Sequence, residues 1–127
     1  MELTTGTVIE RYRVDQRIGS GGMAVVYRVS HTTLDTCHAL KVLTLGGPRI
    51  QERLIREGRV QAGLEHTNIV RVTDVLEIEG SPALLMELID GPDLDTWLRD
   101  HEPSAELGIQ IFEGILRGVE QAHALDI

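Results

Sequence analysis

A glycine-rich stretch near the start of the chain has the composition of a turn that could hold a phosphate. It reads Gly19-Ser20-Gly21-Gly22-Met23-Ala24, between two segments rich in β-branched residues. Glycines let a backbone approach a phosphate closely and present amide N–H groups to it. A plain hairpin turn would use the same residues, so both interpretations stay open. A dinucleotide-binding turn is disfavoured, because that motif needs a helix after its glycines and a strand is expected here.

A lone lysine lies in an apolar segment further along. The chain has 12 cationic residues, and Lys41 is the only lysine among them. An arginine-rich composition alone could explain this bias, or an ammonium group could be needed where a guanidinium would not serve. In a strand, Ala39 and Lys41 share one face. With Val26 of the preceding strand, Ala39 could cover a planar base while Lys41 reaches a phosphate. The alternative is an edge lysine with its stem on apolar surface.

A carboxylate is expected on the apolar face of a helix spanning residues 48–64. Glu57 lies between Leu54 and Leu64 on that face. Desolvating a carboxylate without a cation is costly, so Glu57 needs a partner. Arg53, four residues earlier, is one candidate, and Lys41 is the other.

The elements that must position these groups follow from hydrophobic periodicity and turn signals. The first half predicts strands and the second half mostly helices, which is an α+β pattern. Pro48 suits the first position of a helix, and Ser104 suits the N-cap of another. The expected elements are strands Glu10–Ile18, Ala24–Ser30 and His38–Thr44, the helix 48–64, strands Ile69–Ile78 and Ala83–Ile89, a short helix Asp93–Asp100, and a helix from Ser104 to about Leu125.

Composition narrows the class of protein. The 127 residues are 42% hydrophobic and carry a formal net charge of −8, so a globular fold is expected and a dominant nucleic-acid interface is not. Cys37 is the only cysteine, which excludes an internal disulfide and fits a reducing cytoplasm. The start of the chain lacks the apolar core of a signal peptide, and no stretch predicts a membrane span.

Taken in order, these motifs resemble the small lobe of protein kinases, most closely bacterial serine/threonine kinases of the eukaryotic (Hanks) type. The resemblance runs from about Tyr12 to Ile127. Besides the glycine turn, it rests on five motifs, which are His38-Ala39-Leu40-Lys41, Arg56-Glu57, His66-Thr67-Asn68-Ile69-Val70, Leu85-Met86-Glu87-Leu88-Ile89-Asp90-Gly91 and Ala122-His123-Ala124-Leu125-Asp126-Ile127.

The resemblance implies a fold and a set of roles. A small lobe over residues 1–91, with a five-stranded antiparallel sheet and one helix, would precede two helices of an incomplete large lobe, 92–127. Lys41 would hold the α- and β-phosphates of ATP, and Glu57 would position Lys41. The other expected nucleotide contacts are Ile18, Gly19, Ser20, Gly21, Gly22, Met23 and Ala24 over the phosphates, Val26 and Ala39 over the adenine, Met86 behind it, backbone groups of Glu87 and Ile89 at its edge, Asp93 on the ribose and Leu94 beneath the base.

Some positions depart from the family pattern. Ala24 replaces the third glycine, Thr67 a usual proline, and Gln61 a usual apolar residue of the helix. In the family pattern, the H-R-D loop would begin about two residues after Ile127. We therefore expect that this chain alone does not phosphorylate proteins, that its Mg²⁺ ligands lie outside it, and that the last helix exposes Ile111, Ile115 and Val119 for self-association.

Three functions remain for comparison. The favoured one is the ATP-binding portion of a serine/threonine protein kinase, with ATP and protein substrates as partners of the whole protein. The alternative is a non-catalytic, kinase-derived module for protein interaction. The third is an unrelated α/β domain in which the glycines only form a turn. Retention of the glycines, Lys41 and Glu57 favours the first, because a pure interaction module has no need of them.

Overall fold

The computed structural model describes residues 2–127, which form two compact units. The first unit comprises the chain up to Gly63 together with Arg71–Leu88, and the second comprises Leu64–Val70 together with Ile89–Ile127. The two units are described separately below.

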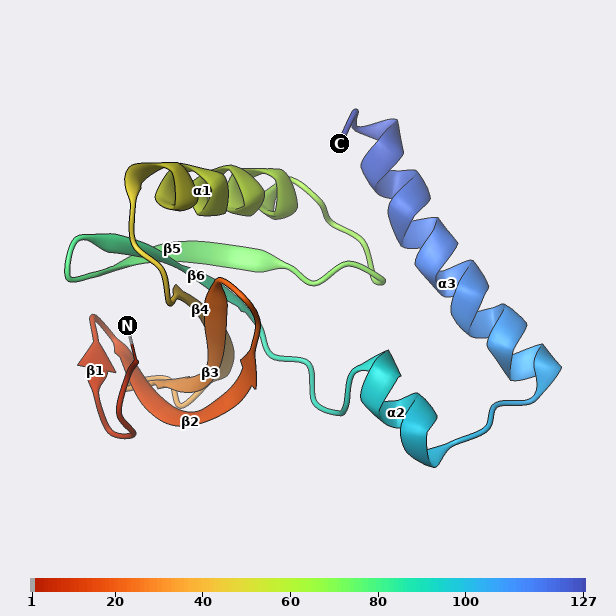
Figure 1. Cartoon of the computed structure of the whole chain (residues 1–127), viewed down its shortest axis with the longest axis horizontal. Helices are drawn as coiled ribbons and strands as arrows, with labels where there is room; N and C mark the ends of the chain where they lie inside the picture. Colours follow the sequence, from red (N-terminus) through yellow and green to blue (C-terminus); the bar gives the residue numbers. More distant parts are fainter. Residues whose placement is uncertain (1) are drawn as a thin grey trace. The chain divides into compact units, whose positions relative to one another are not determined.

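The first unit is built on an antiparallel sheet with the strand order β1-β2-β3-β4-β6-β5 (Figure 1). Five of these strands are the expected ones, with ends shifted by up to three residues. The sixth is β1, whose two residues are too few to show a period of two in the sequence. The strands are β1 Val8–Ile9, β2 Tyr12–Ser20, β3 Ala24–His31, β4 Cys37–Leu43, β5 Val72–Ile78 and β6 Ser81–Glu87.

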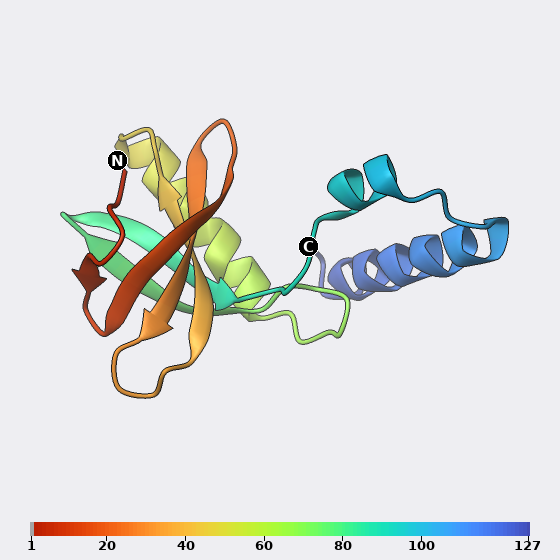
Figure 2. The same ribbon diagram turned by 90° about the horizontal axis from the view of Figure 1, so that it is seen from below.

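The sheet curls until its two edge strands, β1 and β5, approach each other, as the two views show (Figures 1 and 2). Alternate side chains of the strands fill the interior of this curl, as the pleat requires. The interior cluster consists of Ile9, Val14, Val25, Tyr27, Val29, Leu40, Val42, Leu76, Ile78, Ala83 and Leu85. Burial of these apolar side chains is the main stabilisation of the unit.

Helix α1, Pro48–Ala62, covers β5 and β6 on the opposite face of the sheet (Figure 1). Pro48 begins the helix as expected. A second apolar cluster joins helix and sheet through Leu43, Leu54, Val72 and Leu84. Gly58 marks the closest approach, because a Cβ atom added there would lie 2.7 Å from Leu84 Cδ2.

The expected turn between β5 and β6 is a tight one. Its two central residues, Glu79 and Gly80, have φ angles of 49° and 80°. Two successive positive φ values are typical of the turn type that matches the twist of paired strands. This turn fixes the register of β5 against β6, in which Val75 lies opposite Leu84 and Val72 opposite Met86.

The second unit contains two helices, α2 Leu94–Asp100 and α3 Ala105–Ala124. Asp93 and Ser104 cap them by accepting hydrogen bonds from the N–H groups of Thr96 and Leu107. Asn68 Nδ2 donates to the carbonyl of Gly114 at 2.9 Å, which holds the 64–70 segment to α3. Within residues 2–127 no helix has the length and apolar character that crossing a membrane requires.

Candidate functional site

The register of the first unit places the predicted site residues in two neighbouring rows across the sheet. Gly19 pairs with Val26, Val26 with Lys41, and Lys41 with Leu84. In the adjacent row Ala39 pairs with Met86. Directly paired residues point to the same side of a sheet, so Val26, Ala39 and Lys41 share one face. This confirms the grouping expected from period two.

The partner of Glu57 is Lys41. Lys41 Nζ lies 2.7 Å from Glu57 Oε1, with 28% of the lysine side chain and 44% of the glutamate side chain exposed. This short charge-assisted hydrogen bond joins β4 to α1. It decides between the two cations that the sequence left open, since the structure pairs Glu57 with Lys41. Arg53 instead lines the small hollow of about 60 Å³ beside this pair, together with Met23, Ala24, Ile50 and Leu54.

The glycine turn is held by backbone hydrogen bonds at its end. Gly21 N donates to the carbonyl of Ala24 at 2.8 Å, and Thr44 N donates to the carbonyl of Met23 at 2.9 Å. The second bond ties the turn to the end of the lysine strand. Gly21 and Gly22 have no positive φ, and a Cβ added to either would meet no atom closer than 3.9 Å. Neither a positive φ nor a close neighbour among the described residues therefore requires glycine at these two positions.

The residues expected around a base are only partly free to bind one. Ala39 is buried and Met86 is half-buried. Glu87 N donates to the carbonyl of Arg71 at 2.9 Å, and Arg71 N donates to Glu87 Oε1 at 2.9 Å. The N–H of Glu87 is therefore already used by the residue that precedes β5, so a contact from Glu87 to an adenine edge would have to use its carbonyl.

The remaining predicted residues are spread over both units. Ile18 is an exposed residue of β2 in the first unit. Ile89, Asp93 and Leu94 belong to the second unit. Asp93 Oδ1 accepts a 2.7 Å hydrogen bond from Thr96 N, and this bond holds the pKa of the carboxyl below its usual value. Leu94 lines an apolar hollow with residues of α3, including Phe112. Their roles toward a nucleotide stay predictions.

Two residues beside the ion pair, Leu84 and Gly58, are not among those predicted from the sequence. Leu84 is fully buried and pairs with Lys41 across β4 and β6. Its Cδ2 atom lies directly over Gly58, 2.7 Å from the place that a Cβ atom would occupy there. Gly58 follows Glu57 directly, so the contact sets how close the glutamate approaches the sheet. A glycine inside a predicted helix was the signal that could have revealed it, since glycine there is costly without a packing reason.

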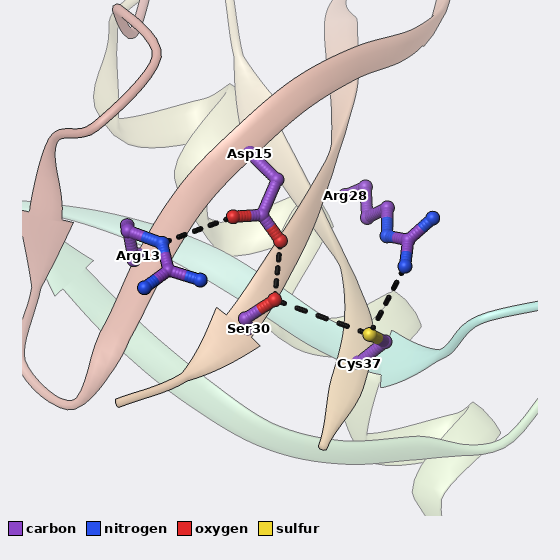
Figure 3. A network of polar contacts seen from close by, with 5 residues as sticks. All are labelled: Arg13, Asp15, Arg28, Ser30 and Cys37. Carbon is purple, nitrogen blue, oxygen red and sulfur yellow. Dashed lines mark hydrogen bonds and ion pairs between the residues drawn. The ribbon is translucent and has the colours of Figure 1, made fainter. Parts of the chain in front are cut away.

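A network of polar contacts spans three strands of the same sheet (Figure 3). Ser30 is buried, and its hydroxyl donates to Asp15 Oδ2. Arg13 Nε donates to Asp15 Oδ1 at 3.1 Å, and Arg28 Nη2 donates to Cys37 Sγ at 3.3 Å. The register shifts between Val14 and Gln16, and this bulge re-aims Asp15. The network joins β2, β3 and β4 and contains none of the predicted site residues.

Asp15→Asn is expected to destabilise the protein by about 1 kcal/mol at pH 7, because it weakens the hydrogen bond from the hydroxyl of the buried Ser30. The Ser30 bond, helped by Arg13, holds the pKa of Asp15 below its usual value of 3.8. A depressed pKa contributes stability above the unfolded value, and this is lost as pH falls through the folded value. Urea unfolding should therefore show a difference at pH 7 that narrows below pH 4.

The exposed carboxylate of Glu113 on α3 supplies the control. Glu113→Gln should leave the free energy of unfolding nearly unchanged at both pH values. An Asp15→Asn difference that stays constant down to pH 3 would contradict the assigned role of the carboxylate.

Two further expectations can be placed in the structure. Ile115 and Val119 of α3 are 48% and 43% exposed, as expected, whereas Ile111 is half-buried because it lines the apolar hollow with Leu94. Self-association through this helix stays a prediction. Over residues 2–127 no group of three or more His, Cys, Asp or Glu side chains is arranged to hold a metal ion.

Comparison with known proteins gives one family. The sequence pattern described as "Protein kinase domain" matches residues 12–127. The serine/threonine-protein kinase PknJ of Mycobacterium tuberculosis is 32% identical over 125 residues. That match covers 96% of this chain and 21% of the relative, so the chain spans about a fifth of the relative's length.

Solved structures agree on the fold. The kinase domain of M. tuberculosis PknI superposes with a TM-score of 0.80 at 27% identity. The match covers 97% of this chain and 51% of that one. Rad53 residues 1–466, solved in complex with AMP-PNP, gives a TM-score of 0.80 at 26% identity, covering 93% of this chain and 32% of that one.

Proposed function

The chain belongs to the protein kinase domain family, and on that premise we propose that it binds ATP through Lys41, Glu57 and the Gly19–Ala24 turn. In the whole protein, this site would deliver the γ-phosphate of ATP to serine and threonine hydroxyls. The observation that carries the proposal is the 2.7 Å bond between Lys41 Nζ and Glu57 Oε1, next to Met23 and Ala24 of the turn.

The chemistry of the pair fits this role. An ammonium group is a compact cation that can contact two phosphates, and the carboxylate keeps it from lying along the sheet. The glycine turn presents backbone N–H groups without side chains between them and the ligand. The half-buried Val26 and the buried Ala39 lie on the same face of the sheet as Lys41, where a base would pack against them. The AMP-PNP bound to the related Rad53 is an adenine nucleotide, which supports the same ligand class here.

The proposal covers the nucleotide half of phosphate transfer. The 127 residues contain no H-R-D-x-x-x-x-N sequence and no D-F-G. In this family those motifs orient the acceptor hydroxyl and hold Mg²⁺, which neutralises charge on the phosphates. We assign neither task to a residue of this chain, and we propose that these residues alone transfer no phosphate.

Lys41→Met should weaken ATP binding by at least about tenfold, because it removes the only cation that we assign to the phosphates. Calorimetry with Mg²⁺ present, wild type beside variant, measures this. Arg11→Met is the matched control, since Arg11 is exposed and lies outside the site. It should bind ATP as the wild type does. In the same preparation, radioactive ATP should label no generic protein substrate.

Other outcomes have distinct meanings. Equal ATP binding by the wild type and Lys41→Met would refute the proposed site. No binding by either would favour the alternative of a non-catalytic interaction module. Substrate labelling that Lys41→Met abolishes would show that the chain transfers phosphate unaided, against our proposal.

A further inference from the structure

Three arginines form a stripe on the exposed surface of α1. Arg49, Arg53 and Arg56 follow one another at spacings of four and three residues, and all three are exposed. At 100° per residue they fall within about 60° of arc on the helix. Together with Glu52 they line a hollow of about 250 Å³. We call these three residues the arginine stripe.

The stripe lacks compensating charge. Among residues 2–127, none of its three guanidinium groups forms an ion pair with a carboxylate. The carboxylate of Glu57, four residues after Arg53, is held by Lys41 at 2.7 Å. Glu52 is the single carboxylate in the hollow. Three positive charges against one negative charge leave a local excess of cations on a chain whose formal net charge is −8.

This arrangement is unfavourable for the helix itself. Like charges at spacings of three and four residues repel each other. Arg49 lies in the first turn, where the helix dipole favours anions, and this turn has no acidic residue. The N-cap, Gly47, contributes no side-chain hydrogen bond. An anion bound between the three guanidinium groups would relieve the repulsion along the stripe, and local violations of this kind are typical of functional sites.

We propose that the arginine stripe binds the phosphate group of a phosphorylated protein segment. A phosphomonoester carries nearly two negative charges and three acceptor oxygens, whereas a carboxylate carries one charge and two oxygens. Guanidinium forks match phosphate with paired, charge-assisted hydrogen bonds. Three exposed forks around one hollow are thus better matched by phosphate. Arg53 also lines the hollow beside Lys41, whereas Arg49 and Arg56 line only the hollow of the stripe, so the proposed site adjoins the nucleotide site and shares Arg53 with it.

The test uses the whole chain without nucleotide, so that failure of ATP binding does not affect it. The probe is a fluorescein-labelled peptide of alanine and glycine with one central phosphothreonine, titrated by fluorescence anisotropy beside its unphosphorylated form. Phosphorylation should tighten binding by at least about tenfold. Arg49→Gln with Arg56→Gln should lose most of that gain. Arg59→Gln with Arg117→Gln removes the same charge from exposed positions outside the stripe and should change affinity less than about twofold.

Thermal unfolding gives an independent readout. Without phosphopeptide, Arg49→Gln should raise the unfolding temperature because it removes repulsion at the helix start. Arg59→Gln should not raise it, because Arg59 lies in the last turn, where a cation is favoured. Equal loss of peptide binding in both double variants would mean that the peptide responds to net charge and not to the stripe, and would overturn the proposal. Binding to phosphatidylglycerol vesicles with no preference for the phosphopeptide would overturn it in favour of a lipid surface.

Discussion

Replacing Leu84 by alanine is expected to lower the free energy of unfolding of the first unit by about 2–5 kcal/mol. Leu84 is fully buried between the sheet and α1, where it packs with Leu54, Leu43 and Val72. Removing three carbon atoms would leave a cavity that neighbours on a hydrogen-bonded sheet cannot close. Urea unfolding followed by circular dichroism measures the loss.

The same substitution should also weaken ATP binding, because Leu84 stands beside Lys41 and beneath the helix that carries Glu57. Leu34→Ala is the matched control, since Leu34 is 68% exposed and should change stability by less than about 0.5 kcal/mol. If Leu84→Ala proved as mild as Leu34→Ala, the assigned packing between helix and sheet would be wrong.

Gly58→Val is expected to destabilise the first unit by about 1–3 kcal/mol and to displace Glu57 from Lys41. A Cβ atom at this position would lie 2.7 Å from Leu84 Cδ2, and valine adds two further methyl groups. Because Leu84 is fully buried, its side chain has little room to move aside. The helix must then shift away from the sheet. Urea unfolding and ATP calorimetry measure the two effects.

A double-substitution cycle isolates the contact. In an open helix, glycine to alanine is stabilising by about 0.5–1 kcal/mol. Gly108→Ala on α3 should show that gain, because a Cβ there meets no atom within 4 Å. Gly58→Ala should lack it in the wild type and recover it in the Leu84→Ala background, where the opposing atom is gone. Additive effects of the two substitutions would rule out the proposed contact.

Much of the fold was predictable because strands and helices impose their own periods on the sequence. Period two placed Ala39 and Lys41 on one face, and the register confirmed it. Turn chemistry placed Gly80, and capping chemistry placed Ser104. These signals are local, so they can be recognised in the sequence without knowledge of the rest of the chain.

The rest depends on contacts between residues far apart in the sequence. Whether Glu57 pairs with Arg53 or with Lys41 depends on the distance between α1 and β4. Hydrophobic periodicity carries no information about that distance. The contact between Gly58 and Leu84 spans 26 positions, and the bulge at Asp15 arises from pairing with β3. The use of the Glu87 N–H by Arg71 likewise requires the register of β5 and β6.

The curled sheet has a consequence for behaviour at high concentration. Beyond Val14, no strand among the described residues pairs with the outer side of β2. Free edges of this kind recruit strands from other molecules and begin aggregation. Here the free stretch carries Asp15, Gln16 and Arg17, and its register is broken twice, at Asp15 and again before Gly19. Charge and irregular pairing are the features by which natural sheets resist pairing edge to edge, so the irregular strand that leads into the glycine turn is a poor template for a strand of another molecule.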